Sequence, residues 1–395
     1  MVIIIGESAL AYWRTPPCVR DVEISLANLP DAYRPDTKVA QRLARERPND
    51  GAAIRKIRGR VLSDLKGIPL PIRIITDEMQ RVGDSPIVSI RRGNAPAIRP
   101  FCVDLGNDLF VASPELAIAQ AARGRTDAAL LHLMYEACGI YALFYPTKRA
   151  QLVLSSLPQE QLSGSPITAY SDEFGIPLTF DETGSQRWSY CEGKNPRKGT
   201  LWKRPPLATH EQLKDAYREI KEVNGIVRAR SLAPFVLDGS GSPLETTMCL
   251  LEFLPAYRGG EQWEIPHLNR TVLLNENARN IQDSDHLVAD QEWHNRLAIL
   301  EVNSMGHHAD PTGFARTSRR RVSLEAMGYV VREINYEQIE DLDKLNIILE
   351  SYAEPLGLKH CPRTASFLDA RERLHRDLFS IPGIHGKALK NDPGW

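Results

Sequence analysis

The sequence predicts a mixed α/β protein, α+β overall, with more than one domain. Its 395 residues, of which 42% are hydrophobic and 25% charged, are enough for two or three buried cores. Helical and strand-like segments alternate along the chain, as they do in proteins whose sheets are flanked by helices. Apolar runs of strand length are separated by Gly, Asn and Asp, which is typical of hairpins.

Residues 1–147 are expected to form an α+β domain. Residues 6–14 (GESALAYWR) have an apolar side and are predicted to be helical. Residues 68–78 and 101–113 are predicted to be strands, and the second run contains a Gly-Asn-Asp turn at Gly106 that fits a hairpin.

Two helices are predicted to end this domain. Residues 113–124 begin with Ser113 and Pro114, a capping side chain followed by a proline at the first helical position. The glutamate that comes next suits the positive end of a helix dipole. Residues 127–143 then predict a mostly apolar helix that ends near Gly139.

Residues 148–238 are expected to be a linker and a helical connecting region, because they are rich in Ser, Gly, Pro and basic residues before a charged helix at 208–225. A basic cluster in this region could contact phosphate or form a solvated loop. Its members are Lys194, Arg197, Lys198, Lys203 and Arg204.

Residues 239–354 are expected to form a second domain with the order α-β-β-α-β-α, which fits a mixed sheet flanked by helices. Its helices are predicted at 242–255, 313–328 and 336–353, and its strands are two runs of a hairpin within 288–308 and a strand at 329–335. No element is predicted between the first helix and the hairpin. Residues 355–395 are expected to be an appended helical tail with a frayed end.

The hairpin raises a chemical question, because the apolar run before Val302 contains the charged Glu301. If the turn is centred near Asn295, Asp290 and Glu301 face each other with Cβ atoms about 5 Å apart. Two such carboxylates repel each other, so one pKa is raised unless a cation lies between them. Mg²⁺ would resolve the conflict, since it favours one or two carboxylates with water and phosphate. The alternative is a strand that surfaces at Glu301, with Asp290 flanking a turn.

Several motifs occur here in a recognisable order. A Ser-Pro-x-Glu helix start precedes an Asp and a Glu eleven positions apart, a His lies seven residues beyond the Glu, and an Arg-rich helix ends in LEAMG before an apolar strand. Residues 241–331 thereby resemble the PD-(D/E)XK nuclease superfamily, particularly its very-short-patch-repair-like branch. Together with residues 8–14, 111–120 and 135–143, the chain resembles actinobacterial proteins that join such a domain to an AbiEi-antitoxin-like N-terminal region.

The resemblance implies a C-terminal restriction-endonuclease-like mixed sheet and a DNA endonuclease that uses Mg²⁺ or Mn²⁺. It makes Asp290 and Glu301 the metal-binding carboxylates and Glu245 the acidic residue on a helix that completes the site. It places His308 and Arg320 near the substrate phosphate. His308 also fits an exposed polar loop, and Glu245 also fits a capping box with the serine three residues before it.

Two positions depart from the family pattern. Asn303 joins the predicted catalytic set where the family has Lys, or Asp in the very-short-patch branch, and Thr317 stands where relatives often have an acidic residue. A lysine can orient water and stabilise developing charge, whereas a neutral amide can only hydrogen-bond. A degenerate site is therefore the alternative: a non-catalytic regulator, like an AbiEi-type antitoxin, that binds DNA or a toxin partner.

The composition bounds the remaining possibilities. A net charge of −1 gives no global attraction to nucleic acid or to a membrane surface, so any basic footprint must be local. The six cysteines form no CxxC pair, and no apolar run approaches the length of a membrane span. These features predict a cytoplasmic protein with reduced thiols.

Overall fold

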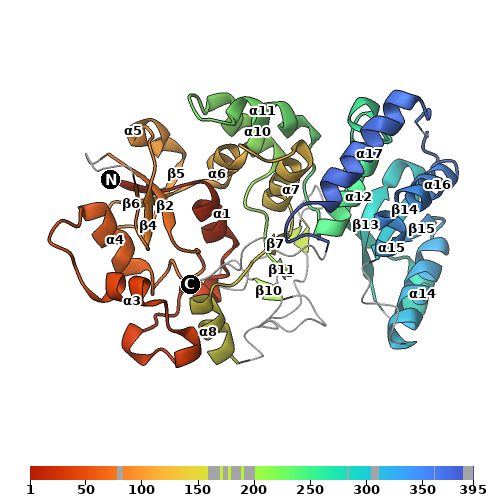
Figure 1. Ribbon diagram of the computed structural model, residues 1–395. Helices are drawn as coiled ribbons and strands as arrows, with labels where there is room; N and C mark the ends of the chain where they lie inside the picture. The colour runs from red at the N-terminus through yellow and green to blue at the C-terminus, as the bar shows by residue number, and fades with distance from the viewer. Residues whose placement is uncertain are drawn as a thin grey trace.

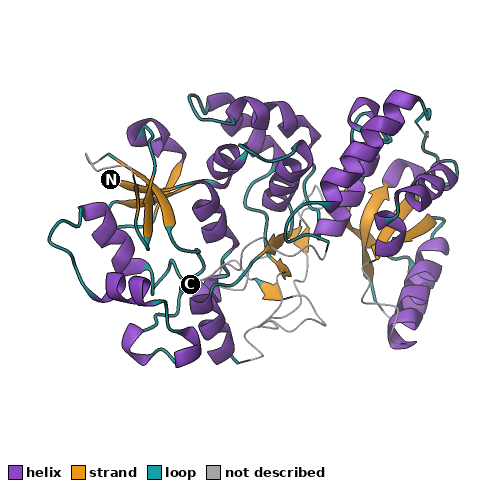
Figure 2. Ribbon diagram, viewed as in Figure 1, coloured by secondary structure: helices purple, strands orange, loops and turns teal. Residues whose placement is uncertain are grey.

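The computed structural model arranges the chain as an elongated row of units (Figure 1). It describes residues 1–77, 83–158, 170–171, 177–178, 188–190, 201–282, 284–303, 311–359, 361–385 and 395. A six-stranded sheet lies at one end of the row, helices fill the middle, and a four-stranded sheet lies at the other end (Figure 2). The predicted mixed α/β class is confirmed.

The N-terminal sheet has the strand order β3-β4-β2-β1-β6-β5. Its strands are β1 (Val2–Ile4), β2 (Ile72–Thr76), β3 (Gly83–Asp84), β4 (Val88–Ile90), β5 (Cys102–Asp104) and β6 (Leu109–Ala112). The apolar β1 is wholly buried because it lies inside the sheet, antiparallel to β2 and parallel to β6. The strand predicted within 68–78 is β2, and the predicted hairpin is β5 and β6, which pair antiparallel.

Helices pack on this sheet and continue into the middle of the molecule (Figure 1). They are α1 (Gly6–Arg14), α2 (Pro17–Arg20), α3 (Thr37–Ala44), α4 (Ala52–Arg60), α5 (Ala95–Ile98), α6 (Pro114–Ala121), α7 (Asp127–Cys138) and α8 (Lys148–Ser156). α1 has the predicted bounds. α6 begins as predicted, because the Ser113 hydroxyl accepts a hydrogen bond from the Leu116 amide at 3.3 Å. α7 ends one residue before Gly139.

A small sheet in the middle of the molecule includes the end of the predicted linker. Its strands, in the order β10-β11-β7, are β10 (Ser189–Tyr190), β11 (Leu201–Lys203) and β7 (Tyr141–Leu143). Lys203 ends β11, and Arg204 is buried, with its guanidinium donating to the Glu136 carbonyl at 2.6 Å. Neither residue belongs to a solvated loop. The other members of the basic cluster lie outside the described residues: Lys194, Arg197 and Lys198.

The charged helix predicted at 208–225 is shorter than expected and is followed by a second helix. The two are α10 (His210–Glu219) and α11 (Ile226–Leu232). Both pack against α6, so this part of the predicted connecting region belongs to the folded middle of the molecule. A separate two-stranded sheet is formed by β8 (Tyr170–Ser171) and β9 (Pro177–Leu178).

The C-terminal sheet has the order β12-β13-β14-β15, and its first three strands are antiparallel while β14 and β15 are parallel. The strands are β12 (His267–Leu273), β13 (His286–Trp293), β14 (Ala298–Asn303) and β15 (Val330–Asn335). The helices are α12 (Pro243–Phe253), α13 (Glu276–Gln282), α14 (Pro311–Glu325), α15 (Tyr336–Glu340) and α16 (Leu342–Ala353). β12 and α13 were not predicted.

The single helix predicted at 336–353 is wrong, because Asp341 divides it into α15 and α16. Asp341 has extended backbone angles, and its carboxylate accepts a hydrogen bond from the Lys344 amide at 3.1 Å. An aspartate in this position caps a new helix instead of continuing the previous one.

The two faces of the C-terminal sheet are covered by different helices. Leu300 and Val302 of β14 belong to the core that α12 and α16 share. Ile299, which points the other way, packs in a smaller core with Ala278 of α13 and Leu324 of α14. β14 is therefore buried on both sides, as expected for an inner strand.

The predicted C-terminal tail is an integral part of the fold. α17 (Ala365–Phe379) packs against α7 and α12, and the buried Arg371 makes an ion pair with Glu261. The terminal Trp395 reaches the N-terminal unit, where its indole donates to the Tyr33 carbonyl at 2.6 Å. In the part of the chain that the structure describes, no helix has both the length and the apolar character needed to cross a bilayer.

Candidate active site

The β13–β14 hairpin has the predicted register. Gln291 pairs with Leu300 and Glu292 with Ile299, so continuing the ladder by one position brings Asp290 opposite Glu301. At that point the Asp290 carboxylate accepts a hydrogen bond from the Val302 amide at 2.7 Å. The two carboxylates that the sequence predicts to face each other therefore do so.

A cation lies beside Glu301, and it is a guanidinium from α14. Arg320 donates to both carboxylate oxygens of Glu301, at 2.8 and 2.9 Å from Nη2 and 3.2 Å from Nε, and also to the Val288 carbonyl. Its neighbours Arg319 and Arg321 are exposed, as expected for consecutive residues spaced about 100° apart on a helix. Glu301 is thus buried at the end of an apolar strand because an arginine neutralises it.

The pKa values of both Asp290 and Glu301 are raised. Burial and the neighbouring Glu301 charge raise the pKa of Asp290 to about 7, against the lowering effects of Arg320 and the Val302 amide. Burial also raises the pKa of Glu301, whereas Arg320 and a hydrogen bond with Asp290 lower it. Both carboxyl groups therefore keep a proton to a higher pH than an exposed carboxyl group does.

Glu245 brings a third carboxylate to the same place from α12. Its side chain accepts hydrogen bonds from the Gly241 amide at 2.8 Å and the Asn269 amide group at 2.6 Å. Burial and the charge of Asp290 raise the pKa of Glu245, so the two carboxylates are close enough to interact. The Ser242 hydroxyl caps the helix by accepting from the Glu245 amide at 3.2 Å. The capping box is half formed, since the Glu245 carboxylate bonds to Gly241 and not to Ser242.

Asn269 was missed by sequence reasoning. It lies within β12, where its backbone takes a left-handed conformation with φ of 48°, which asparagine tolerates better than most residues. Residues four positions apart on a regular strand lie on the same face of the sheet. Here Leu268 packs in the core with α12, whereas Val272 packs in the core with α13 and α14, so the kink reverses the two faces of the strand. The Asn269 side chain is thereby turned toward Glu245, and no sequence pattern marks that reversal.

The other residues of the predicted site lie in different surroundings. The Asn303 amide group contacts the Glu333 carboxylate at 3.3 Å. Glu333 is paired with Glu301 in the parallel β14–β15 register, so Asn303 is held at the β15 side of the cluster. Thr317 is half-buried on α14. His308 lies outside the described residues.

The donor chemistry of the cluster fits a hard divalent cation, with one obstacle. Asp290, Glu301 and Glu245 supply carboxylate oxygens, and burial is the main cause that raises the pKa values of these groups. However, Arg320 contacts both oxygens of Glu301. Within the described residues no group of three or more His, Cys, Asp or Glu side chains is arranged to hold a metal ion. Metal binding therefore requires Arg320 to release Glu301 and the three carboxylates to move closer together.

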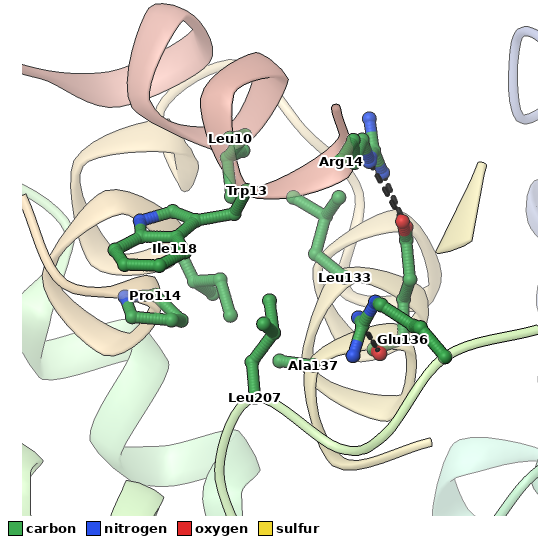
Figure 3. Close-up of a pocket in the computed structure, with 10 residues that line it drawn as sticks. Leu10, Trp13, Arg14, Pro114, Ile118, Leu133, Glu136, Ala137 and Leu207 are labelled. Carbon is green, nitrogen blue, oxygen red and sulfur yellow. Dashed lines mark hydrogen bonds and ion pairs between the residues drawn. The ribbon is translucent and has the colours of Figure 1, made fainter. Parts of the chain in front are cut away.

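A second buried ion pair lies between α1 and α7 (Figure 3). Arg14 donates to the Glu136 carboxylate through two nitrogen atoms, one at 2.7 Å, and the Leu143 amide donates to the same carboxylate at 3.0 Å. The cavity beside them, lined by Trp13 and Ile118 among others, has a volume of about 20 Å³, which is room for about one water molecule. This ion pair is satisfied and serves packing, so the hairpin cluster is the better candidate site.

Comparison with known proteins adds no relative, since no family model, curated protein or solved structure matches the chain.

Proposed function

We propose that the chain is a metal-dependent DNA endonuclease of the PD-(D/E)XK type that hydrolyses phosphodiester bonds. The observation that carries the proposal is the cluster of Asp290, Glu301 and Glu245, three carboxylates from three elements with raised pKa values, in which Asp290 interacts with both of the others. Groups perturbed in this way by burial and by one another occur often at functional sites.

The order of elements around the cluster also supports the proposal. A helix (α12) is followed by three antiparallel strands, with α13 between the first two, then by a crossover helix (α14) and a strand parallel to the third. This order is compatible with the restriction-endonuclease-like arrangement that the sequence resemblance implies.

In this proposal Asp290 and Glu301 hold Mg²⁺ or Mn²⁺, and Glu245 lies beside them. The bound ion would lower the pKa of a water molecule and neutralise charge on the phosphate. Arg320, once released from Glu301, presents a planar guanidinium whose paired N–H groups match two phosphate oxygens. Arg320 thus holds the site closed in the absence of ligand and contacts substrate in its presence.

Calorimetric titration with Mg²⁺ and with Mn²⁺ tests the proposal, combined with cleavage assays on single-stranded, duplex and mismatched DNA. We expect binding and metal-dependent cleavage by the wild type, and loss of both in Asp290→Ala and Glu301→Ala. Asp343→Ala, at an exposed acidic residue in the first turn of α16, is the matched control. A wild-type protein that binds neither ion and cuts none of these substrates would refute the proposal.

One observation favours a second candidate, a non-catalytic regulator that binds DNA or a toxin partner. Arg320 already neutralises Glu301, and Asn303 is engaged by Glu333, so the cluster is internally compensated without a metal. For this candidate, DNA or partner affinity should be unchanged by Asp290→Ala. Binding assays on the same variants therefore separate the two functions.

A further inference from the structure

Position 303 is an asparagine that contacts Glu333, where the resembled superfamily carries a lysine, or an aspartate in its very-short-patch branch. A different lysine reaches the cluster from outside the C-terminal sheet. The ammonium of Lys203, at the end of β11, donates to the Gly241 carbonyl at 2.6 Å. The amide of the same Gly241 donates to the Glu245 carboxylate at 2.8 Å, so one residue links the two charged groups.

The charge of Lys203 acts on two members of the cluster. It lies close enough to Glu245 and to Asp290 to interact electrostatically with both carboxylates. An ammonium has three hydrogen-bond donors, and within the described residues the Gly241 carbonyl engages one of them. Lys203 is half-buried, so its remaining donors can meet an anion that enters the cluster.

The position of Lys203 is fixed by the fold. Its strand β11 pairs with β7, where Lys203 is opposite Tyr141. The Tyr141 hydroxyl contacts the Thr246 hydroxyl of α12 at 3.0 Å, and the Ile140 amide donates to the Ser240 carbonyl at 2.9 Å. The small middle sheet is therefore joined directly to the start of the helix that carries Glu245.

Close packing maintains this junction. A Cβ atom on Gly241 would lie 2.9 Å from the Asn269 side chain and 3.0 Å from the Glu245 carboxylate. These distances are shorter than ordinary contacts, so the glycine allows Lys203, Glu245 and Asn269 to approach the same residue.

We propose that Lys203 is the phosphate-binding ammonium group of this site, supplied by β11 in place of a lysine at position 303. The inference rests on the proposed nuclease function. Lys203 would stabilise negative charge on the phosphate while Asp290 and Glu301 hold the metal. The site then spans the middle sheet and the C-terminal sheet.

Lys203→Met, which keeps most of the side-chain volume without the charge, tests the inference in the full-length protein. We expect the cleavage rate at saturating Mg²⁺ to fall about 100-fold or more, as when one charge-stabilising donor is removed from an active site. Mg²⁺ affinity should be kept or improved, because a competing cation has gone. Lys203→Arg should retain part of the activity. Lys148→Met, at an exposed lysine in α8, is the matched control.

A second measurement separates failure of this inference from failure of the proposed function. Fluorescence anisotropy with labelled duplex DNA, in the absence of divalent metal, gives the affinity of the protein for the phosphate backbone. Lys203→Met should weaken this binding about tenfold, because one phosphate contact is lost, whereas Lys203→Arg and Lys148→Met should stay close to the wild type. An inactive wild type whose DNA binding is weakened in Lys203→Met would overturn the nuclease function alone. An unchanged DNA affinity, or a cleavage rate within twofold of the wild type, would overturn the role of Lys203.

Discussion

Replacing Asp290 with asparagine should stabilise the protein above neutral pH. The carboxyl is held beside Glu301 in a buried hairpin, and its pKa is raised to about 7 from an ordinary value of 3.8. Asparagine has nearly the same shape, can still accept the hydrogen bond from the Val302 amide, and cannot ionise. The substitution therefore removes a charge that the folded state disfavours.

The sign and size follow from proton linkage. Between pH 3.8 and about 7 the folded protein keeps a proton on Asp290 that the unfolded chain has released, so wild-type stability falls as pH rises through this window. Each pKa unit corresponds to about 1.4 kcal/mol, so the full penalty above pH 7 is at most about 4 kcal/mol. Part of this free-energy penalty belongs to Glu301, because the two carboxylates are coupled. We therefore expect a gain in stability of roughly 2 kcal/mol in Asp290→Asn at pH 8.

Denaturant unfolding at pH 4.5, 6 and 8 measures this difference, with Asp343→Asn as the exposed control. The stability gain of Asp290→Asn should be largest at pH 8 and only about a quarter of that value at pH 4.5, where the unfolded chain has released most of the proton. Addition of Mg²⁺ at pH 8 should stabilise the wild type more than the variant if the site binds metal. A variant that is less stable than the wild type at pH 8, or a difference that does not change with pH, would refute the reasoning.

Three further predictions concern the surroundings of the cluster and a separate buried pair. Arg320→Met should destabilise the protein by roughly 3 kcal/mol at pH 8 in denaturant melts, because it leaves the buried Glu301 carboxylate without its partner. Adding Glu301→Gln to this variant should recover much of the lost stability. Gly241→Ala should cost about 1–3 kcal/mol by overpacking, visible as a lower Tm, and a Tm equal to that of the wild type would contradict the packing described. Burial holds the pKa of His132 at about 3 and that of His385 at about 4. The folded protein therefore takes up fewer protons than the unfolded chain below pH 6.5, and stability should fall with decreasing pH by up to about 1.4 kcal/mol per pH unit for each histidine. His132→Gln should reduce that slope in urea melts at pH 5 and 7, and an unchanged slope would count against the assignment.

The features that the sequence predicted correctly depend on neighbouring residues. The hairpin between β13 and β14 follows from two apolar runs and a polar turn, and its symmetry places Asp290 opposite Glu301. The Ser113 cap of α6 follows from a serine and a proline in succession. Local spacing decides such features, so they can be predicted from the sequence alone.

The features that were missed depend on contacts between distant segments or on backbone conformation. Lys203 belonged to a basic cluster with no visible partner, and only the pairing of β11 with β7 brings it to Gly241. Asn269 has a left-handed backbone conformation that reverses the two faces of β12. This reversal interrupts the alternation of apolar and polar residues that predicts a strand. Arg320 was predicted beside phosphate, but the sequence did not show that Glu301 would bind it first.

The position of α17 has a consequence for work with shortened proteins. Arg371 in that helix pairs with Glu261 and also donates to the Leu251 carbonyl at 2.9 Å, so residues far along the chain complete the surroundings of α12. A fragment cut to residues 239–354 would leave Glu261 buried without its arginine and would uncover the apolar side of α12. It would also lack Lys203. Inactivity or insolubility of such a fragment would therefore not show that the site lacks function. Biochemical experiments should use all 395 residues.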